Sequence, residues 1–208
     1  VDGDMKKFMK SSASEIMEIL NLAHVSMPID EFDLMATNWL DTARQQRFDK
    51  KYTEMTYKPM VELLEYLRSK QFKTYIVSGG TTQFIRLFSE QAYGIPPERV
   101  IGTMSKAEYK DGKVLLTTEL WHNNDEGNKP VGIYQIIGRK PIFAFGNSDG
   151  DYEMLEWTSK NSRPNLSLLL HHTDAEREYA YDRDSDIGRL AQGLDDASRH
   201  GWIVVDMK

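Results

Sequence analysis

The chain has 208 residues, 40% of them hydrophobic and 28% charged, which suits one domain or one domain with a small satellite. Its 26 Lys and Arg against 32 Asp and Glu give a formal net charge of −6, and no basic run occurs, which argues against nucleic acid or an anionic membrane as partner. The chain contains no cysteine, which excludes disulfides and thiolate sites, and it contains no apolar stretch near the roughly 20 residues of a membrane span.

The first quarter of the chain indicates helices. Apolar residues recur at steps of three and four across residues 5–20, which predicts an amphipathic helix. Asp30 is placed to cap a second helix across residues 32–40, and residues 58–70 predict a third. Residues 42–51 carry charges and few apolar side chains, so we expect a connection there.

Beyond residue 72 the pattern changes to short β-branched and aromatic runs separated by helical segments. A hairpin is predicted at residues 108–120 with its turn at 110–113, and Lys129-Pro130 predicts a helix start because proline fits the first turn. Strands that alternate with helices indicate an α/β fold, a Rossmann-like and mostly parallel sheet flanked by helices, with a small helical layer from the first quarter. The other strands are predicted at residues 72–77, 99–103, 141–145, 166–170 and 202–205.

The first polar candidate is Ser78-Gly79-Gly80, directly after the strand predicted at residues 72–77. In an open parallel sheet, ligands bind beyond the carboxyl ends of the strands. The two glycines let the backbone approach a ligand closely, and the N–H groups at the start of the next helix suit a phosphate. Ser78 adds a hydroxyl donor. The alternative interpretation is an ordinary strand-to-helix turn with a serine cap.

A second polar segment, residues 146–151 with the sequence Gly-Asn-Ser-Asp-Gly-Asp, follows the strand predicted at 141–145. Several oxygen side chains in a glycine-containing loop suit Mg²⁺, a hard cation that takes oxygen ligands and keeps several waters. The alternative is an acidic, capped turn. The spacing is not that of a calcium-binding EF-hand, because no glutamate stands at the required distal position.

Lys129 and two adjacent histidines are the remaining candidates. Lys129 precedes a helix start and is placed to neutralise phosphate oxygens, although a lysine is most often a solvated charge. His171 and His172 point to opposite sides of an extended chain, so at most one of them serves a site, and zinc would need further ligands. Residues 174–178 indicate a solvated, capped helix start. Ser78 lacks the Gly-x-Ser-x-Gly context of a serine hydrolase.

Three of these segments, in this order, resemble known motifs. Residues 76–80 (Ile-Val-Ser-Gly-Gly), the isolated Lys129 before a helix, and residues 145–151 resemble motifs two, three and four of the haloacid dehalogenase superfamily. The match looks closest to the branch related to phosphoserine phosphatases. Residues 171–178 are also similar to a stretch found in uncharacterised bacterial members. Any one motif alone has low specificity, whereas the three together are fairly specific.

The resemblance implies a role for most of the candidate residues. Ser78 would hydrogen-bond the transferring phosphoryl group beside the backbone of Gly79 and Gly80, and Lys129 would neutralise its charge. Asn147 falls where many relatives have a Mg²⁺-binding aspartate, so its amide oxygen would be a neutral ligand. Asp151 would hold a metal-bound water or the lysine. The carboxylate between them in sequence, at position 149, receives no role.

The resemblance also implies an aspartate nucleophile in a first motif, a hydrophobic strand followed by Asp-x-Asp-Gly-Thr. Asp2-Gly3-Asp4 does not match this pattern, because no apolar strand precedes it and its order differs. We therefore expect the motif upstream of the cap. On this expectation residues 1–56 are a partial helical cap, and residues 57–208 are the core without its first strand.

The sequence thus predicts a Mg²⁺-dependent phosphomonoester hydrolase that acts on a small phosphorylated molecule. Two alternatives remain: a non-catalytic phosphate-binding or interaction protein on the same fold, and an inactive truncated fragment. We expect a soluble protein of the cytoplasm or periplasm, without nucleic acid or membrane as partner. Substrate identity and oligomeric state stay open.

Overall fold

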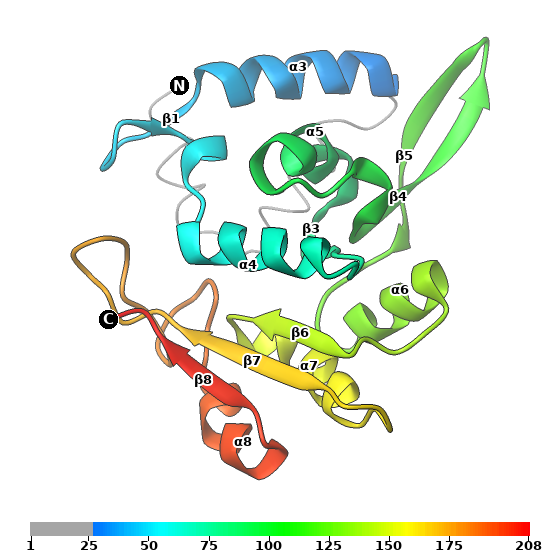
Figure 1. Cartoon of the computed structure of the whole chain (residues 1–208). Helices are drawn as coiled ribbons and strands as arrows, with labels where there is room; N and C mark the ends of the chain where they lie inside the picture. The colour runs from blue at the N-terminus through cyan, green and yellow to red at the C-terminus, as the bar shows by residue number, and fades with distance from the viewer. Residues whose placement is uncertain (1–26) are drawn as a thin grey trace. The chain divides into compact units, whose positions relative to one another are not determined.

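The computed structural model describes residues 27–208, which fall into two compact units, one up to Asn123 and one from Asn124 to Lys208 (Figure 1). The helix predicted at residues 5–20 lies outside the described residues. Within them, no helix is both long enough and apolar enough to cross a membrane.

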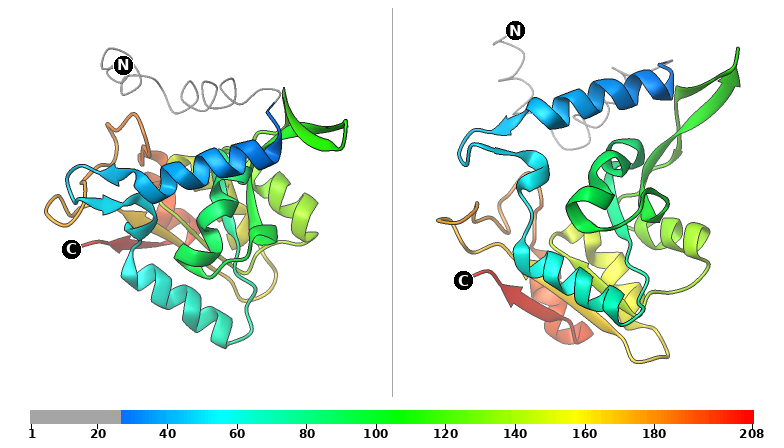
Figure 2. Two further views of the ribbon diagram at one scale, coloured as in Figure 1. Left: turned by 90° about the horizontal axis from the view of Figure 1, so that it is seen from above. Right: turned by 45° about the horizontal axis from the view of Figure 1, so that its top comes forward.

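The first unit begins with the helix α3 (Ile29–Thr42), which packs on α5 (Thr82–Tyr93), as Figures 1 and 2 show. The prediction that Asp30 caps this helix is wrong: the helix starts after Pro28, whose backbone is extended, and Asp30 lies inside the first turn. Phe32, Ala36 and Leu40 are buried at four-residue spacing, which places them on one face.

The rest of the helical part follows the sequence pattern closely. The connection predicted at residues 42–51 is a short hairpin of β1 (Arg44–Gln45) and β2 (Lys50–Lys51), followed by a 3₁₀ turn, η1 (Tyr52–Glu54). The third predicted helix is confirmed as α4 (Lys58–Ser69).

The sheet of the first unit has the strand order β3-β4-β5. β3 (Ile76–Thr81) is parallel to β4 (Val100–Lys110), with α5 and the 3₁₀ turn η2 (Pro97–Arg99) between them in sequence. β4 then pairs antiparallel with β5 (Lys113–His122) in a long hairpin that projects from the unit (Figure 2). Its predicted turn is confirmed, because Asp111 and Gly112 both have positive φ, 50° and 80°, as the tight turn requires.

The second unit has a fully parallel sheet in the order β6-β7-β8. Its helices α7 and α8 lie beside each other and pack against the sheet, while α6 packs on α7. Ile133, Leu155, Leu169 and Leu190 form the buried centre, each with at most 1% of its surface exposed. In chain order the elements are α6 (Asn128–Ile137), β6 (Phe143–Gly146), the 3₁₀ turn η3 (Asp149–Asp151), α7 (Tyr152–Ser159), β7 (Leu166–His171), α8 (Gln192–His200) and β8 (Ile203–Asp206).

The α/β fold class is confirmed, and a strand forms at each range predicted beyond residue 72, although the strand predicted at residues 99–103 continues to Lys110 and joins the hairpin. The difference that matters for the candidate site concerns the strand predicted at residues 72–77. It begins at Ile76 and runs through Thr81, so the Ser78-Gly79-Gly80 segment lies inside a strand and not in a turn after it. Among the described residues, β3 and β6 are each the edge strand of a three-stranded sheet.

Candidate functional site

In the first unit, Ser78, Gly79 and Gly80 form a bulge in β3. The pairing with β4 runs from Val77 opposite Ile101 directly to Thr81 opposite Thr103, so three residues of β3 face one residue of β4. Bulges re-aim backbone and side chains and are frequent next to active sites. The Ser78 Oγ accepts a hydrogen bond from the Gly80 N–H at 3.0 Å, and its own hydroxyl hydrogen is a separate donor.

Two residues of β4 shape this bulge, and the sequence analysis overlooked both. Thr103, only 4% exposed, donates its hydroxyl to the Gly79 carbonyl at 2.7 Å. Gly102 lies opposite the bulge, and a Cβ there would come within 2.5 Å of the Gly80 carbonyl oxygen. The signal was available, because an isolated glycine inside a strand pattern often marks a bulge or a close backbone approach.

In the second unit, Lys129 and Asp151 form a buried ion pair. Lys129 Nζ lies 2.7 Å from Asp151 Oδ1, and the side chain of each is 7% exposed. Lys129 is thus not the solvated charge of the alternative interpretation. Because a buried charge is stable only when it is paired and hydrogen-bonded, each of the two fixes the position of the other.

The second oxygen of Asp151 closes the turn that follows β6. Asp151 Oδ2 accepts hydrogen bonds from the backbone N–H groups of Asn147 at 2.9 Å and Ser148 at 3.2 Å. This approach needs Gly146, where a Cβ would lie 2.4 Å from the Asp151 Cβ. Both carboxylate oxygens of Asp151 therefore bond to protein donors, and of the two roles expected for it, the structure shows contact with the lysine.

Asn147 meets a histidine and a tyrosine from beyond β7. Its Nδ2 lies 3.3 Å from His172 Nε2 and 3.5 Å from the Tyr181 hydroxyl. The other ring nitrogen of His172, Nδ1, lies 2.9 and 3.1 Å from the two oxygens of Glu178. Burial raises the pKa of the Tyr181 hydroxyl further above its usual range. The expectation that residues 174–178 form a solvated helix start is wrong, because Glu178 is 9% exposed and the segment is a turn.

His171, by contrast, faces the other way and bonds to Asp182 with Nε2 3.1 Å from Oδ2. The two adjacent histidines therefore point to opposite sides, as predicted for an extended chain. Of the two histidines, His172 is the one that contacts a candidate site residue among the residues that the structure describes.

Asp149 has a structural role that the sequence did not reveal. Its carboxylate accepts hydrogen bonds from the backbone N–H groups of Ala191, Gln192 and Gly193, at distances from 2.8 to 3.2 Å. These groups belong to the start of α8, whose own cap residue, Ala191, has no side chain that could accept them. Asp149 thus caps a helix more than 40 residues away.

Residues 146–150 also match the pattern Gly-x-Ser-x-Gly, which the sequence analysis overlooked. A nucleophilic serine of this kind sits on a strained backbone with its hydroxyl near a histidine. Ser148 has an extended backbone, φ −148° and ψ 167°, and its hydroxyl lies 3.4 Å from Asp151 Oδ2. The side chain that contacts His172 Nε2 is that of Asn147. The geometry therefore does not support a serine nucleophile at this position.

The chemistry of the turn at residues 146–151 fits Mg²⁺ better than a softer metal. The described residues contain no group of three or more His, Asp or Glu side chains that could hold a metal ion on its own. Mg²⁺ is commonly bound by one or two protein oxygens and several waters, so it does not require such a group. Because the bonds of the Asn147 amide run through Nδ2, its oxygen Oδ1 is the atom suited to a hard cation.

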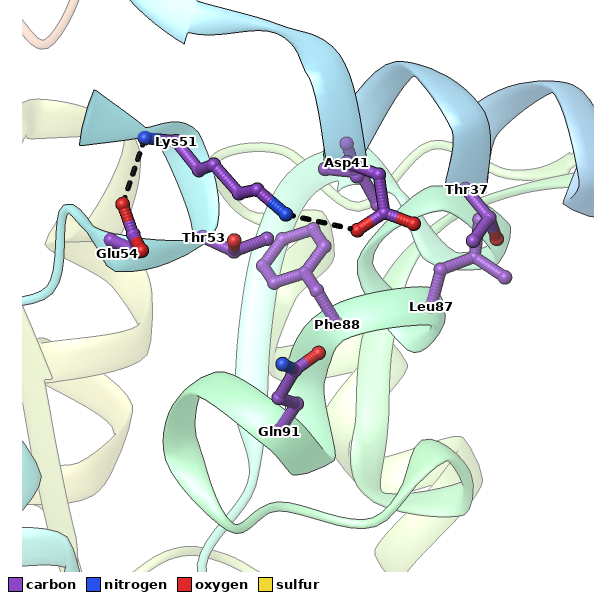
Figure 3. Close-up of a pocket in the computed structure, with 9 residues that line it drawn as sticks. Thr37, Asp41, Lys51, Thr53, Glu54, Leu87, Phe88 and Gln91 are labelled. Atoms are coloured by element: carbon purple, nitrogen blue, oxygen red, sulfur yellow. Dashed lines mark hydrogen bonds and ion pairs between the residues drawn. The ribbon is translucent and has the colours of Figure 1, made fainter. Parts of the chain in front are cut away.

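The first unit also contains a small pocket of about 190 Å³ between α3, η1 and α5 (Figure 3). Among the nine described residues that line it, the cation is Lys51, whose Nζ lies 3.2 Å from Asp41. The Lys51 backbone N–H donates to Glu54 at 3.0 Å. The two carboxylates of this lining, Asp41 and Glu54, outnumber its lysine, so the pocket offers a phosphate little attraction.

Comparisons with known proteins bear on the family of the chain. The profile described as haloacid dehalogenase-like hydrolase matches residues 5–156. No curated protein matches the chain. Among solved structures, a conserved, functionally unknown protein from Anaerococcus prevotii has a TM-score of 0.51 at 24% identity.

The match with the Anaerococcus protein covers 72% of this chain but 37% of that protein, so the chain spans little more than a third of its length. A phosphoserine phosphohydrolase-like protein from Francisella tularensis is 19% identical, with coverage of 89% of this chain and 83% of that one; its TM-score of 0.43 is too low to bear on the fold. The likeness to the Anaerococcus protein agrees with the α/β fold. Because the family profile covers most of the sequence, the chain belongs to the haloacid dehalogenase-like hydrolases.

Proposed function

We propose that this protein is a Mg²⁺-dependent phosphomonoester hydrolase that acts on a small phosphorylated substrate. The observation that supports this best is the buried Lys129–Asp151 pair beside the turn that carries Asn147, in a member of a hydrolase family. A lysine held this way is a fixed positive charge, and phosphoryl transfer depends mainly on positioning and charge neutralisation.

The phosphate would be recognised by Ser78, Gly79 and Gly80. The bulge in β3 supplies backbone N–H groups without side chains at two positions, and α5 begins directly after it at Thr82. Backbone N–H groups at a helix N-terminus favour anions. The Ser78 hydroxyl would donate one further hydrogen bond to a phosphate oxygen.

Lys129 would neutralise phosphate oxygens while it stays paired with Asp151. The ammonium group carries three hydrogens, and the contact with Asp151 Oδ1 at 2.7 Å uses one of them. Because the pair is buried, the ammonium is held without the loss of side-chain freedom that an exposed lysine suffers on binding. Its function would be electrostatic and not that of a proton donor.

Asn147 and Asp151 would hold Mg²⁺, Asn147 through Oδ1 and Asp151 by fixing the turn and the lysine. The bound ion supplies positive charge beside the phosphoryl oxygens. The nucleophile implied by the family is an aspartate of an Asp-x-Asp-Gly-Thr motif, which does not occur in residues 1–208. The division into a cap at residues 1–56 and a core at 57–208 stays a prediction.

Binding and turnover are measured together to test this proposal. Inorganic phosphate is titrated calorimetrically in the presence of Mg²⁺, and hydrolysis of p-nitrophenyl phosphate is followed with Mg²⁺ or with EDTA. The variants are Ser78→Ala, Lys129→Met and the matched control Lys160→Met. Lys160 lies in the same unit as Lys129 and pairs with Glu156, but its side chain is 62% exposed.

Lys129→Met is expected to weaken phosphate binding by about 10- to 100-fold, the equivalent of one hydrogen bond to a charged group, and Lys160→Met is expected to match the wild type. If Lys129→Met does not fold, Ser78→Ala carries the test, because it removes only a hydroxyl. Because the Asp-x-Asp-Gly-Thr motif does not occur in residues 1–208, phosphate binding with little turnover is the expected result for these residues, and robust Lys129-dependent turnover would show that they contain a nucleophile after all. Phosphate binding that is absent, or equal in all variants, would contradict the proposal.

A further inference from the structure

Three side chains without a role in the proposed function lie at or next to the Asn147 amide. His172 and Tyr181 contact the amide, and Glu178 contacts His172. His172, 3% exposed, faces Asn147 with Nε2 and Glu178 with Nδ1. The ring of Tyr181 stacks on that of His172, with centroids 4.4 Å apart and planes 15° apart. A backbone hydrogen bond from Tyr181 N to His172 O at 3.0 Å fixes the same pair. The imidazole is therefore held by a stacked ring, a backbone bridge and a carboxylate.

Glu178 determines which nitrogen of His172 carries the proton. A carboxylate accepts hydrogen bonds, so Nδ1, at 2.9 and 3.1 Å from its two oxygens, must carry a hydrogen. With that hydrogen on Nδ1, Nε2 is the ring nitrogen that faces the Asn147 amide and can accept from its Nδ2. An acceptor at 3.3 Å from the Asn147 amide selects the orientation in which Nδ2 faces His172. The Tyr181 hydroxyl oxygen, 3.5 Å from Nδ2, is a second acceptor for the same NH₂ group and favours the same amide orientation.

We propose that Glu178 and His172 are positioning residues that orient the Asn147 amide so that its oxygen, and not its nitrogen, is offered to the metal ion. This inference rests on the proposed function, which assigns a metal to Asn147. With Nδ2 held between His172 and Tyr181, the planar amide directs Oδ1 away from both rings. Groups that orient a metal ligand in this way commonly change metal affinity by 10- to 100-fold when removed.

An amide ligand needs such orientation more than a carboxylate does. The two oxygens of an aspartate are equivalent, so a half-turn of the side chain leaves an oxygen toward the cation. A half-turn of Asn147 instead presents an NH₂ group, whose hydrogens repel a cation. A chain with asparagine at this position therefore gains from a fixed acceptor at Nε2 of His172, which a chain with aspartate would not require.

The neighbouring pair of His171 and Asp182 provides a matched control. It is also a histidine–carboxylate contact, at 3.1 Å, but it points to the opposite side of the chain. A change there removes an imidazole from the same segment without touching Asn147. Effects common to both histidines would report general packing, whereas effects confined to His172 would report orientation of the amide.

The first experiment reads the protonation of His172 directly in the full chain without metal. Two-bond ¹H–¹⁵N correlation spectra assign the ring nitrogens, and we expect the Nδ1–H tautomer, in which Nδ1 faces Glu178 and Nε2 accepts from Asn147. The side-chain amide signals of Asn147 are expected to shift in His172→Leu and to stay in place in His171→Leu. A proton on Nε2 of His172 in the wild type would overturn the inference.

The second experiment measures Mn²⁺ binding by electron paramagnetic resonance, with Mg²⁺ as competitor. His172→Leu is expected to weaken binding by about 10- to 100-fold, and His172→Gln, whose amide oxygen can accept in place of Nε2, is expected to restore most of it. His171→Leu should match the wild type. If His172→Leu does not fold, Tyr181→Phe replaces it, because it removes one acceptor and keeps the stacked ring; a smaller loss is then expected.

The outcomes separate this inference from the proposed function. Mn²⁺ binding that is lost in Asn147→Ala but unchanged in His172→Leu would overturn the inference and leave the proposed function standing. Mn²⁺ binding that does not depend on Asn147 would overturn the metal assignment, and the inference would fall with it. In an Asn147→Asp background, His172→Leu is expected to have little effect, because a carboxylate needs no orientation. An equal loss in both backgrounds would also contradict the inference.

Discussion

Removal of the Asp149 carboxylate should destabilise α8 and leave the candidate metal site intact. Asp149 accepts four hydrogen bonds from the backbone N–H groups of Ala191, Gln192 and Gly193. In Asp149→Ala these three groups lose their acceptor at the N-terminus of a nine-residue helix. Because the carboxylate points to α8, its loss should not change the turn that holds Asn147.

The expected cost follows from two known effects. Loss of an N-cap side chain costs about 0.5–2 kcal/mol, and loss of a negative charge at a helix N-terminus costs about 0.3–1 kcal/mol. Asp149→Ala should therefore lower the free energy of unfolding by about 1–3 kcal/mol. For a chain of this size, 1 kcal/mol shifts the Tm by about 2–4 °C. Asp149→Asn keeps one acceptor oxygen without the charge, so an intermediate loss is expected.

Urea unfolding followed by circular dichroism gives the overall stability, and amide hydrogen exchange gives the local effect. Exchange at residues 191–193 should become faster in Asp149→Ala. Asp184→Ala is the control, because Asp184 is an exposed carboxylate in the same part of the chain. Wild-type stability and exchange in Asp149→Ala, together with a loss of Mn²⁺ binding, would refute the capping role and make Asp149 a metal ligand.

Two further predictions concern the bulge and the acid stability. Gly102→Ala should lower the free energy of unfolding by about 1–3 kcal/mol and weaken phosphate binding, because its Cβ would lie 2.5 Å from the Gly80 carbonyl oxygen. Gly127→Ala is the control, since a Cβ there meets open space. Equal urea midpoints for the Gly102→Ala and Gly127→Ala variants would contradict this prediction. The backbone N–H and then the side chain of Arg177 lower the pKa of Asp174 to about 2, so its contribution to stability is complete above about pH 4 and is lost as the pH falls toward 2. Asp174→Asn should flatten the dependence of stability on pH in that window, measured by circular dichroism; an unchanged slope would show that Asp174 does not contribute.

The elements that the sequence predicted best are those specified by neighbouring residues. The hairpin turn is an example, because Asp111 and Gly112 adopt positive φ by their own preference. The helix over Lys58–Ser69 is another, since its apolar spacing and the proline near its start suffice. Such signals act within a few residues and need no knowledge of the packing.

The bulge in β3 could not be predicted from its own residues. Ser78-Gly79-Gly80 has the composition of a turn, and the apolar run ends at Val77. It remains in the strand because Gly102 lets the two backbones approach and Thr103 bonds the Gly79 carbonyl. Both partners lie more than 20 residues away, in a strand whose register the sequence does not specify.

The same holds for the side chains around the candidate metal site. The sequence placed Lys129, Asn147 and Asp151 as site residues, but the role of Asp149 depends on backbone groups more than 40 residues distant. His172 was recognised as one of two histidines, and the alternation of an extended chain predicted that they would diverge. Which of them faces Asn147 depends on the register of β7 in its sheet, and Tyr181 then stacks on His172.

The turn at residues 146–151 commits both of its carboxylates to protein donors, and the Asn147 amide is its candidate ligand for a cation. The carboxylate of Asp151 is committed to Lys129 and to two backbone N–H groups, and that of Asp149 to the start of α8. Carboxylate oxygens that already accept these hydrogen bonds would have to give them up to coordinate a cation directly. A metal at this turn would therefore depend on a neutral amide, whose dipole attracts a cation only when the oxygen faces it. The hydrogen bond from Asn147 to His172 therefore supports the proposed metal binding, because it holds the amide in that orientation. A substitution of Glu178, which contacts His172 and not Asn147, is expected to weaken metal binding for the same reason.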